Sequence, residues 1–368
     1  MIEVKNPSEV SSKGQAVFGP VSTLGHEQVV FCHDAATGLR AIIGVHNTTL
    51  GPALGGTRMW MYDSDLDALN DVLRLSRGMT YKASMAGLNL GGGKAVIIGN
   101  SRTMKNEAYM RRFGKFVDNL GGKYITAEDV GTSTRDMEWI KMETDHVTGI
   151  PVSMGGSGDP SPVTAYGVYL GIKASLKKLT GSENLSGKKV IVQGTGNVGY
   201  YLCELLKKEN AKIYVFDIFE DKLNAVVKEF GAEVIKEDQV YSMAADVFAP
   251  CALGAILNKE TIPQLNVPIV CGGANNQLQD EVEDGNRIKD RGILWGPDFV
   301  VNAGGLCNVY TELEGYTKER AYAKADKIYE NTLLCYQFAE ENNITTSNAS
   351  IQLAEKRIRE VGNLNLYL

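Results

Sequence analysis

Short apolar runs alternate with segments of helical periodicity over the first 150 residues. Residues 39–45 form an apolar run typical of a strand, and apolar residues three and four apart predict a helix over 64–79. Ser64, followed by Asp67 three residues later, is a typical helix start. Further elements are expected as a strand at 95–98, a helix at 107–119 and a strand at 123–126. This alternation predicts an α/β fold.

Glycine and proline become frequent at residues 149–162, and we place a domain boundary there. The prediction is an N-terminal domain at 1–148 and a second domain at 149–344. A long helix is expected at 163–179, followed by repeated strand–helix–strand units and then a mostly helical stretch.

Composition and charge narrow the class of protein. The chain has 368 residues, a formal net charge of −6 and 43% hydrophobic residues, which favours a folded protein with a large core and disfavours nucleic-acid binding. The residues before Gln15 lack the apolar stretch of a signal peptide, and no run is long enough to span a membrane. The six cysteines and four histidines show no metal-ligand spacing, so we expect no metal site, reduced cysteines and a cytoplasmic location.

A glycine-rich loop follows the apolar run at 189–193 and precedes a helical pattern. Its sequence is Gly194-Thr195-Gly196-Asn197-Val198-Gly199, a G-x-G-x-x-G motif. In such a motif the first glycine permits a tight turn, the second lets the backbone approach a pyrophosphate, and the third lets the helix pack on the strand. In this strand–turn–helix context the motif predicts a Rossmann-type dinucleotide-binding domain.

Asp217 ends the next predicted strand, 18 residues after Gly199, where an acid can accept hydrogen bonds from ribose hydroxyls. No arginine follows it, so a 2′-phosphate would meet only negative charge, and NAD is preferred to NADP. Asn275 and Asn276 follow a later strand-like run, at the edge where open α/β sheets bind ligands.

Two lysines and an aspartate stand in glycine-rich motifs of the first domain. Gly93-Lys94 departs from a P-loop, because Leu88 and Ala95 replace the required glycine and hydroxyl residue. Beside a nicotinamide, one lysine could bind the carboxylate of an α-amino acid, a second in its neutral form could act as a base, and an aspartate could carry a proton. The simpler alternative is that both lysines are solvated surface residues.

Long motifs in a fixed order resemble the amino-acid dehydrogenase superfamily (Glu/Leu/Phe/Val), and within it the leucine dehydrogenase branch. The resemblance covers nearly the whole chain. The motifs are GPALGGTR (51–58), LRLSRGMTYK (73–82), GLNLGGGKA (87–95), AEDVGT (127–132) and VNAGGL (301–306).

The resemblance implies roles for individual residues. Lys82 matches the lysine that binds the substrate carboxylate, Lys94 the lysine that activates water, and Asp129 the acid that carries a proton. Asn275 or Asn276 matches the amide near the nicotinamide, and the doublet leaves the choice open. Further substrate-binding positions implied by the motifs are Gly55, Gly56, Met79 and Ala127.

The family fold has two domains with a cleft between them, and its C-terminal helices, here about 345–368, return to the first domain. The resemblance also implies a homo-oligomer, often an octamer.

Three apolar positions bear on substrate choice. In the family they line the side-chain pocket, and here they are Leu54, Leu306 and Val309. A second carboxylate buried there would lack a partner, which disfavours glutamate. Discrimination among apolar side chains is weak, about 1–3 kcal/mol per methylene.

The resulting hypothesis is NAD-dependent, reversible oxidative deamination of leucine, valine and isoleucine to 2-oxo acids and ammonium. The alternatives are a phenylalanine or valine dehydrogenase of the same superfamily, and a non-catalytic NAD-binding sensor. Arg58 and Arg77 lie among the motifs, and the simplest role for them is ion pairing within the fold.

Overall fold

The computed structural model describes residues 16–364, and the chain forms two compact α/β units. Of the described residues, the first contains those up to Gly158, Glu312–Tyr316 and those from Lys356 onward, and the second contains Asp159–Thr311 and Thr317–Glu355. The expected two-domain α/β class is therefore confirmed. The N-terminal segment judged to lack a signal peptide lies outside the described residues.

The first unit is built on a mixed five-stranded sheet in the order β1-β2-β4-β3-β5. β1 is antiparallel to β2 and β2 to β4, whereas β3 runs parallel to both β4 and β5. The strands are β1 (Gln28–Asp34), β2 (Leu39–Asn47), β3 (Ala53–Trp60), β4 (Gly91–Ile98) and β5 (Tyr124–Glu128).

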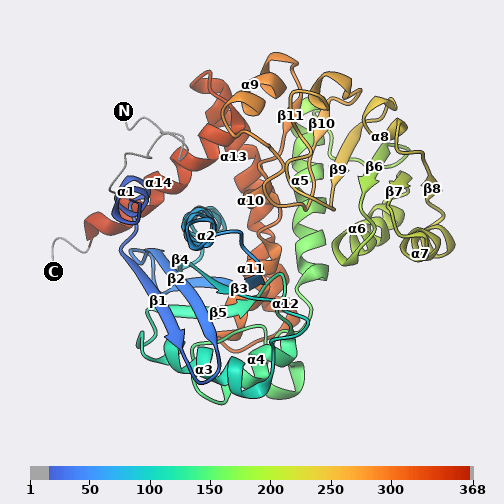
Figure 1. The fold of residues 1–368 in the computed structure, drawn as a ribbon. Helices are drawn as coiled ribbons and strands as arrows, with labels where there is room; N and C mark the ends of the chain where they lie inside the picture. The colour runs from blue at the N-terminus through green and yellow to red at the C-terminus, as the bar shows by residue number, and fades with distance from the viewer. Residues whose placement is uncertain (1–15, 365–368) are drawn as a thin grey trace. The chain divides into compact units, whose positions relative to one another are not determined.

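Helices cover both faces of this sheet (Figure 1). The helices are α1 (Phe18–Leu24), α2 (Asp65–Met85), α3 (Glu107–Asp118) and α4 (Thr134–Lys141). Side chains alternate across a strand, so Val96 and Ile98 pack against α2, whereas Ala95 and Ile97 join the core beneath α3 and α4. Ser64 caps α2 as predicted, accepting a hydrogen bond from the Asp67 amide.

β4 is longer than the expected strand at 95–98, because Gly91, Gly92 and Gly93 belong to it. These glycines permit close packing: a Cβ on Gly92 would lie 2.1 Å from the Thr80 amide nitrogen of α2. The last turns of α2 therefore rest almost directly on the backbone of β4.

The second unit is built on a parallel six-stranded sheet in the order β11-β10-β9-β6-β7-β8. This is the Rossmann strand order, with β6 as the first strand. The strands are β6 (Lys189–Gln193), β7 (Lys212–Phe216), β8 (Glu233–Val234), β9 (Val247–Pro250), β10 (Ile269–Val270) and β11 (Leu294–Trp295).

One face of this sheet is covered by α5, whose Val168, Ile172 and Leu176 pack with Val190 and Val192 of β6. The helices from Ser161 onward are α5 (Ser161–Thr180), α6 (Asn197–Lys208), α7 (Glu220–Phe230), α8 (Gln239–Ser242), α9 (Glu283–Asp290), α10 (Asp298–Val301), α11 (Gly304–Glu312), α12 (Lys318–Ala325), α13 (Lys327–Glu341) and α14 (Thr346–Leu364). The residues of α14 up to Glu355 belong to the second unit and the rest of the helix to the first. Short 3-10 helices lie at Val152–Met154 and Ile262–Gln264. Among the described residues, no helix is both long and apolar enough to cross a membrane.

Candidate active site

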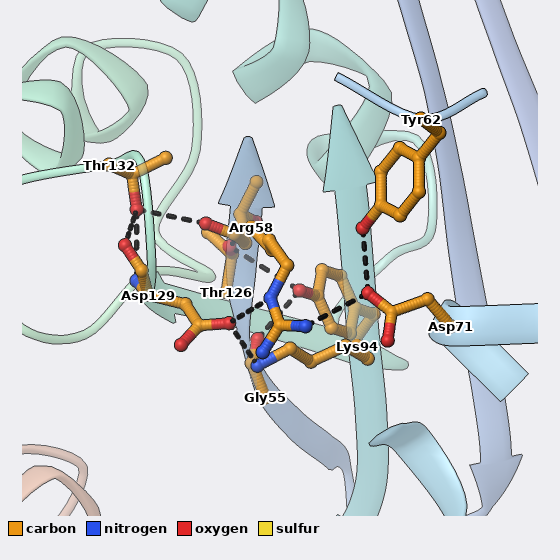
Figure 2. A network of polar contacts seen from close by, with 10 residues as sticks. Gly55, Arg58, Tyr62, Asp71, Lys94, Thr126, Asp129 and Thr132 are labelled. Carbon is orange, nitrogen blue, oxygen red and sulfur yellow. Dashed lines mark hydrogen bonds and ion pairs between the residues drawn. The ribbon is translucent and has the colours of Figure 1, made fainter. Parts of the chain in front are cut away.

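A lysine and an aspartate meet in the first unit (Figure 2). Lys94 lies in the middle of β4 with its side chain only 8% exposed, and its Nζ is 2.6 Å from Oδ2 of Asp129. Asp129 follows β5 directly and is 23% exposed. A charged lysine this buried needs a partner, which the carboxylate supplies. The structure therefore brings together the two residues expected to move protons.

The position of Asp129 depends on a glycine in the neighbouring strand. Gly56 of β3 pairs with Ala127 of β5, two residues before Asp129. A Cβ on Gly56 would lie 2.9 Å from the Asp129 Cβ and 2.5 Å from the Glu128 carbonyl oxygen, so no side chain fits there. Gly56 thus keeps open the space that Asp129 occupies.

A threonine holds the loop after β5. The Asp129 amide donates to Thr132 Oγ1 over 2.9 Å, and Thr132 Oγ1 donates to the Thr57 carbonyl oxygen over 2.8 Å. These bonds attach the loop that carries Asp129 to β3, and fix the backbone from which the carboxylate projects.

Two cations act on the Asp129 carboxylate. Burial alone would raise the pKa of Asp129, but the charges of Lys94 and Arg58 outweigh it and hold the pKa below its ordinary value. Arg58 Nε is 3.3 Å from the same Oδ2 that Lys94 contacts. Asp129 is therefore an ionised carboxylate at neutral pH.

The other expected substrate residues of the first unit lie on β3, β5 and α2. Leu54, Gly55 and Gly56 are buried in β3, and Ala127 is buried in β5. Lys82 and Met79 stand half-buried in the last two turns of α2, which pack on β4.

Tyr124 of β5 fixes the backbone of β3 at Gly55, because its buried hydroxyl donates to the Gly55 carbonyl oxygen over 2.6 Å.

The glycine loop of the second unit has the geometry of a dinucleotide site. Gly194 has φ +96°, which strongly favours glycine, and a Cβ on Gly199 would lie 1.9 Å from the Gly194 carbonyl oxygen. A Cβ on Gly196, by contrast, would meet nothing within 4 Å. The backbone at Gly196 is thus open beside the N-terminus of α6, and these residues fit a pyrophosphate.

The Asp217 carboxylate accepts hydrogen bonds from this loop. Its Oδ2 accepts from the Thr195 amide over 2.6 Å and from Thr195 Oγ1 over 3.2 Å. Its Oδ1 accepts from the Phe219 amide over 3.0 Å. Asp217 therefore links the end of β7 to the glycine loop that starts after β6.

The two candidate asparagines differ in the structure. Asn275 Oδ1 accepts from Asn302 Nδ2 over 2.8 Å, which orients its amide. Asn276 has φ +52°, and its carbonyl oxygen accepts from the Ala255 amide over 2.7 Å. Leu306 and Val309 also belong to this unit, three residues apart on α11.

Three residues around Asp129 were not predicted as a group. Arg58 was expected to form ion pairs, which is confirmed, but its partners Asp71 and Asp129 were not foreseen. Arg58 Nη1 is 3.0 Å from Asp71 Oδ2, and the Tyr62 hydroxyl donates to the same oxygen over 2.7 Å. Asp71 and Tyr62 belong to none of the glycine-rich motifs, so the sequence offered no signal for them.

Two models of protein families match most of the amino-acid sequence of this chain. The Glu/Leu/Phe/Val dehydrogenase dimerisation domain matches residues 26–146, and the Glutamate/Leucine/Phenylalanine/Valine dehydrogenase model matches 155–218 and 215–365. The chain belongs to this family of amino-acid dehydrogenases, which are oxidoreductases.

Individual relatives carry different substrate names. The chain is 54% identical to leucine dehydrogenase of Geobacillus stearothermophilus over 93% of each chain. It is 46% identical to phenylalanine dehydrogenase of Bacillus thermotolerans, with 92% of this chain and 90% of the relative covered. The crystal structure of L-tryptophan dehydrogenase from Nostoc punctiforme superimposes with a TM-score of 0.84 at 45% identity, covering 94% of this chain and 99% of that one.

Proposed function

We propose that the protein catalyses the NAD-dependent, reversible oxidative deamination of branched-chain L-amino acids, with leucine, valine and isoleucine as substrates. The observation that carries this proposal is the contact between Lys94, a buried lysine on β4, and Asp129, an ionised carboxylate directly after β5. The high identity to leucine dehydrogenase over nearly the whole chain supports the substrate class.

In the proposed reaction Lys82 binds the substrate carboxylate as a point charge. NAD held by the loop Gly194–Gly199 would supply the acceptor for the hydride of the substrate α-carbon, and the substrate would thereby become an imine. Lys94 in its neutral form takes a proton from a water molecule, and the water oxygen adds to the imine carbon. Asp129 transfers protons to and from the substrate nitrogen, which then leaves as ammonia when the carbon–nitrogen bond breaks.

The atoms and electrons balance over this sequence. One amino acid, one NAD⁺ and one water give one 2-oxo acid, one ammonium ion, one NADH and one proton. The reverse reaction uses the same groups, because Lys94 and Asp129 can each take up or release a proton.

Apolar residues support the proposed substrate class. Leu54 is 2% exposed and Leu306 is 6% exposed, and with the half-buried Val309 these are the positions that the family uses for the substrate side chain. None of the three carries a charge that could pair with the second carboxylate of glutamate. Aromatic substrates form the second candidate class, since relatives at 46% identity are named for phenylalanine and tryptophan.

The cofactor preference rests on Asp217 and its neighbours. The next residues are Ile218, Phe219 and Glu220, so no cation stands beside Asp217 in sequence to pair with a 2′-phosphate. We therefore propose NAD rather than NADP, bound by the loop Gly194–Gly199, with Asn275 and Asn276 as candidates near the nicotinamide.

We also propose a homo-oligomer, supported by the matching family model, which is described as a dimerisation domain. An octamer is the form that the family resemblance favours. The six cysteines are all free, which fits the proposed cytoplasmic location. Light scattering of the purified protein measures the subunit number.

The decisive experiment measures kcat/KM for leucine, valine, isoleucine, phenylalanine, tryptophan and glutamate, with NAD and NADP in parallel. We expect the branched-chain substrates with NAD to give the highest values. Highest activity on glutamate would overturn the argument from apolar residues. Binding of NAD without turnover of any amino acid would leave the non-catalytic sensor as the better explanation.

A further inference from the structure

An arginine stands between two carboxylates in the first unit (Figure 2). Arg58 Nε is 3.3 Å from Asp129 Oδ2, and Arg58 Nη1 is 3.0 Å from Asp71 Oδ2. Tyr62 donates its hydroxyl hydrogen to Asp71 Oδ2 over 2.7 Å. Lys94 contacts the same Asp129 oxygen as Arg58 does, and these residues form one continuous set of polar contacts, here called the Arg58 chain (Tyr62, Asp71, Arg58, Asp129 and Lys94).

The Arg58 chain is partly shielded from solvent. The side chains of Arg58, Asp71 and Asp129 are 26%, 24% and 23% exposed, and that of Lys94 is 8% exposed. Charges that are partly buried interact more strongly than surface ion pairs, because water and salt screen them less. A change of charge at one member should therefore change the pKa of the other titratable members.

Its two cations are not equivalent. Lys94 and Arg58 contact the same oxygen of Asp129, at 2.6 Å and 3.3 Å. An arginine keeps its proton in proteins, whereas a lysine can lose its own. When Lys94 becomes neutral in the proposed reaction, Asp129 loses the charge of its nearest cation, and only Arg58 still provides one.

We propose that Arg58 is a positioning residue that keeps Asp129 in place and negatively charged while Lys94 gains and loses its proton, and that Asp71 limits how strongly Arg58 does so. This inference rests on the proposed function, because it takes the proton transfers of Lys94 and Asp129 as given. Tyr62 stabilises Asp71 from the other side.

Several elements supply the charged and titratable groups that face Asp129. These are Lys94 on β4, Arg58 on β3, Tyr62 in the segment after β3, Asp71 on α2 and Tyr124 on β5. Of these, Arg58 and Asp71 can be changed without altering either proposed proton-transfer residue.

Substitutions at Arg58 and Asp71 should act in opposite directions. Arg58→Gln removes a permanent positive charge, so the acid limb of the pH profile of kcat/KM should move to higher pH by about 1 unit. Asp71→Asn removes the negative charge that offsets Arg58, so the same limb should move to lower pH. A residue with a purely structural role would lower the rate without moving the limb.

Two further variants sharpen the test. Arg58→Lys keeps the positive charge but has no planar fork with which to reach both carboxylates. Its acid limb should therefore lie between those of the unmodified protein and Arg58→Gln. Tyr62→Phe removes one hydrogen bond to Asp71 without changing the charge, so its effect should be smaller than that of Asp71→Asn. Thermal unfolding of each variant shows that it is folded, and Asp71→Asn tests the proposal even where Arg58→Gln does not fold.

A second readout separates this inference from the proposed function. In protein labelled with ¹³C at aspartate carboxyl groups, the Asp129 signal, assigned with Asp129→Asn, should titrate at higher pH in Arg58→Gln and at lower pH in Asp71→Asn. This holds whether or not any amino acid is turned over. Shifts in the same direction for both variants, or no shift in folded Arg58→Gln, would overturn the inference. Absence of turnover in the unmodified protein would instead refute the proposed function.

Discussion

Single residues determine what the centre of the first unit can do. Lys94 has a charged group at a strand position where an apolar side chain would ordinarily be buried, and Asp129 is the partner that makes this possible. Gly56 in turn leaves the space in which Asp129 lies. Each of these residues can be tested by one substitution.

Replacement of Lys94 by alanine should abolish most of the activity. In the proposed mechanism this removes the base that activates water, so we expect kcat to fall by roughly 10²–10⁴-fold, the usual contribution of a general base. The affinity for NAD, measured by calorimetry, should change little, because the dinucleotide loop belongs to the second unit.

The matched control is Lys105→Ala, which removes a lysine–aspartate contact of the same 2.6 Å length, with Asp136. It should lower stability and leave kcat unchanged. Equal loss of kcat in both variants would contradict the role given to Lys94.

Addition of one methyl group at Gly56 should displace Asp129. The new Cβ in Gly56→Ala would lie 2.5 Å from a carbonyl oxygen and 2.9 Å from the Asp129 Cβ, so the backbone must shift. We expect a loss of about 1–3 kcal/mol in the free energy of unfolding, together with a lower kcat. Chemical denaturation measures the first and initial rates the second.

A glycine in open space provides the control. A Cβ on Gly78, in the interior of α2, would meet nothing within 4 Å. Gly78→Ala should therefore stabilise the protein by up to about 1 kcal/mol, because alanine favours the helix. A stabilising effect of Gly56→Ala would show that the contacts at Gly56 relax without cost.

At the scale of elements, the half-buried His26 and the buried His46 attach α2 to β2 and to the segment before β1. His26 Nε2 lies 2.8 Å from Ser76 Oγ, and His46 Nδ1 lies 2.7 Å from Thr80 Oγ1. Ser76 and Thr80 both belong to α2. The two imidazole rings contact each other edge to face, with their centroids 4.8 Å apart. Burial lowers the pKa of His26 to about 4 and that of His46 to about 3.

Stability should therefore fall in mild acid. The folded protein keeps both rings neutral, whereas the unfolded chain takes up protons below about pH 6.5, so protonation favours unfolding. The histidine contribution is intact above about pH 6.5 and is lost as the pH falls towards 4. Urea unfolding between pH 4 and 7 should show this slope, and it should be shallower in His26→Gln and His46→Gln.

The exposed His33 supplies the control, as His33→Gln should leave the slope as it is. If the slope is the same in all three variants, carboxylates rather than histidines cause the acid sensitivity.

Local pattern predicted the elements whose apolar residues repeat regularly. The helix at 64–79 and the strand at 189–193 were foreseen, and the second coincides with β6. The strand β3 was not foreseen, since its Gly55-Gly56 pair is unfavourable in an isolated strand. Its place in the sheet is set by close packing against β4 and β5, which only the folded chain reveals.

The candidate site was predictable only where long motifs carried it. Lys94 and Asp129 stand in such motifs, and the structure places them in contact. Asp71 and Tyr62 lie at helical and loop positions with no distinguishing neighbours. The contacts that Asp71 makes with Arg58 and with Tyr62 depend on how α2 packs on the sheet. Contacts of this kind form only in the folded chain, and no local sequence pattern predicts them.

At the scale of the whole molecule, the chain passes between the two units several times. Glu312, where it re-enters the first unit, has a carboxylate that accepts from the Gly149 amide over 3.0 Å, from the Ser157 amide over 2.9 Å and from the Ser157 hydroxyl. Burial raises the pKa of Glu312 despite these hydrogen bonds. One side chain thus joins two segments that lie more than 150 residues apart in sequence.

Loss of this carboxylate should destabilise the protein. Glu312→Gln replaces an acceptor oxygen with a donor, which leaves an amide of Gly149 or Ser157 poorly paired, so we expect a loss of about 1–3 kcal/mol. A double-mutant cycle with Ser157→Ala, measured by chemical denaturation, should give a coupling energy of at least about 0.5 kcal/mol.

The exposed Glu341 on α13 accepts from Gln337 of the same helix, and Glu341→Gln should cost less than about 0.5 kcal/mol. Strict additivity in the cycle would show that Glu312 and Ser157 act independently.

The last helix contributes to the unit that is made first. Arg357 of α14 donates from Nη1 to the carbonyl oxygens of Ser84 and Leu88, at 3.2 Å and 2.9 Å, and so closes the end of α2, which carries Lys82. During synthesis on the ribosome, the amino-terminal half must therefore wait for some 270 further residues before this helix end receives its partner. A nascent chain halted before Arg357 would carry both lysines yet lack the contact that completes their scaffold.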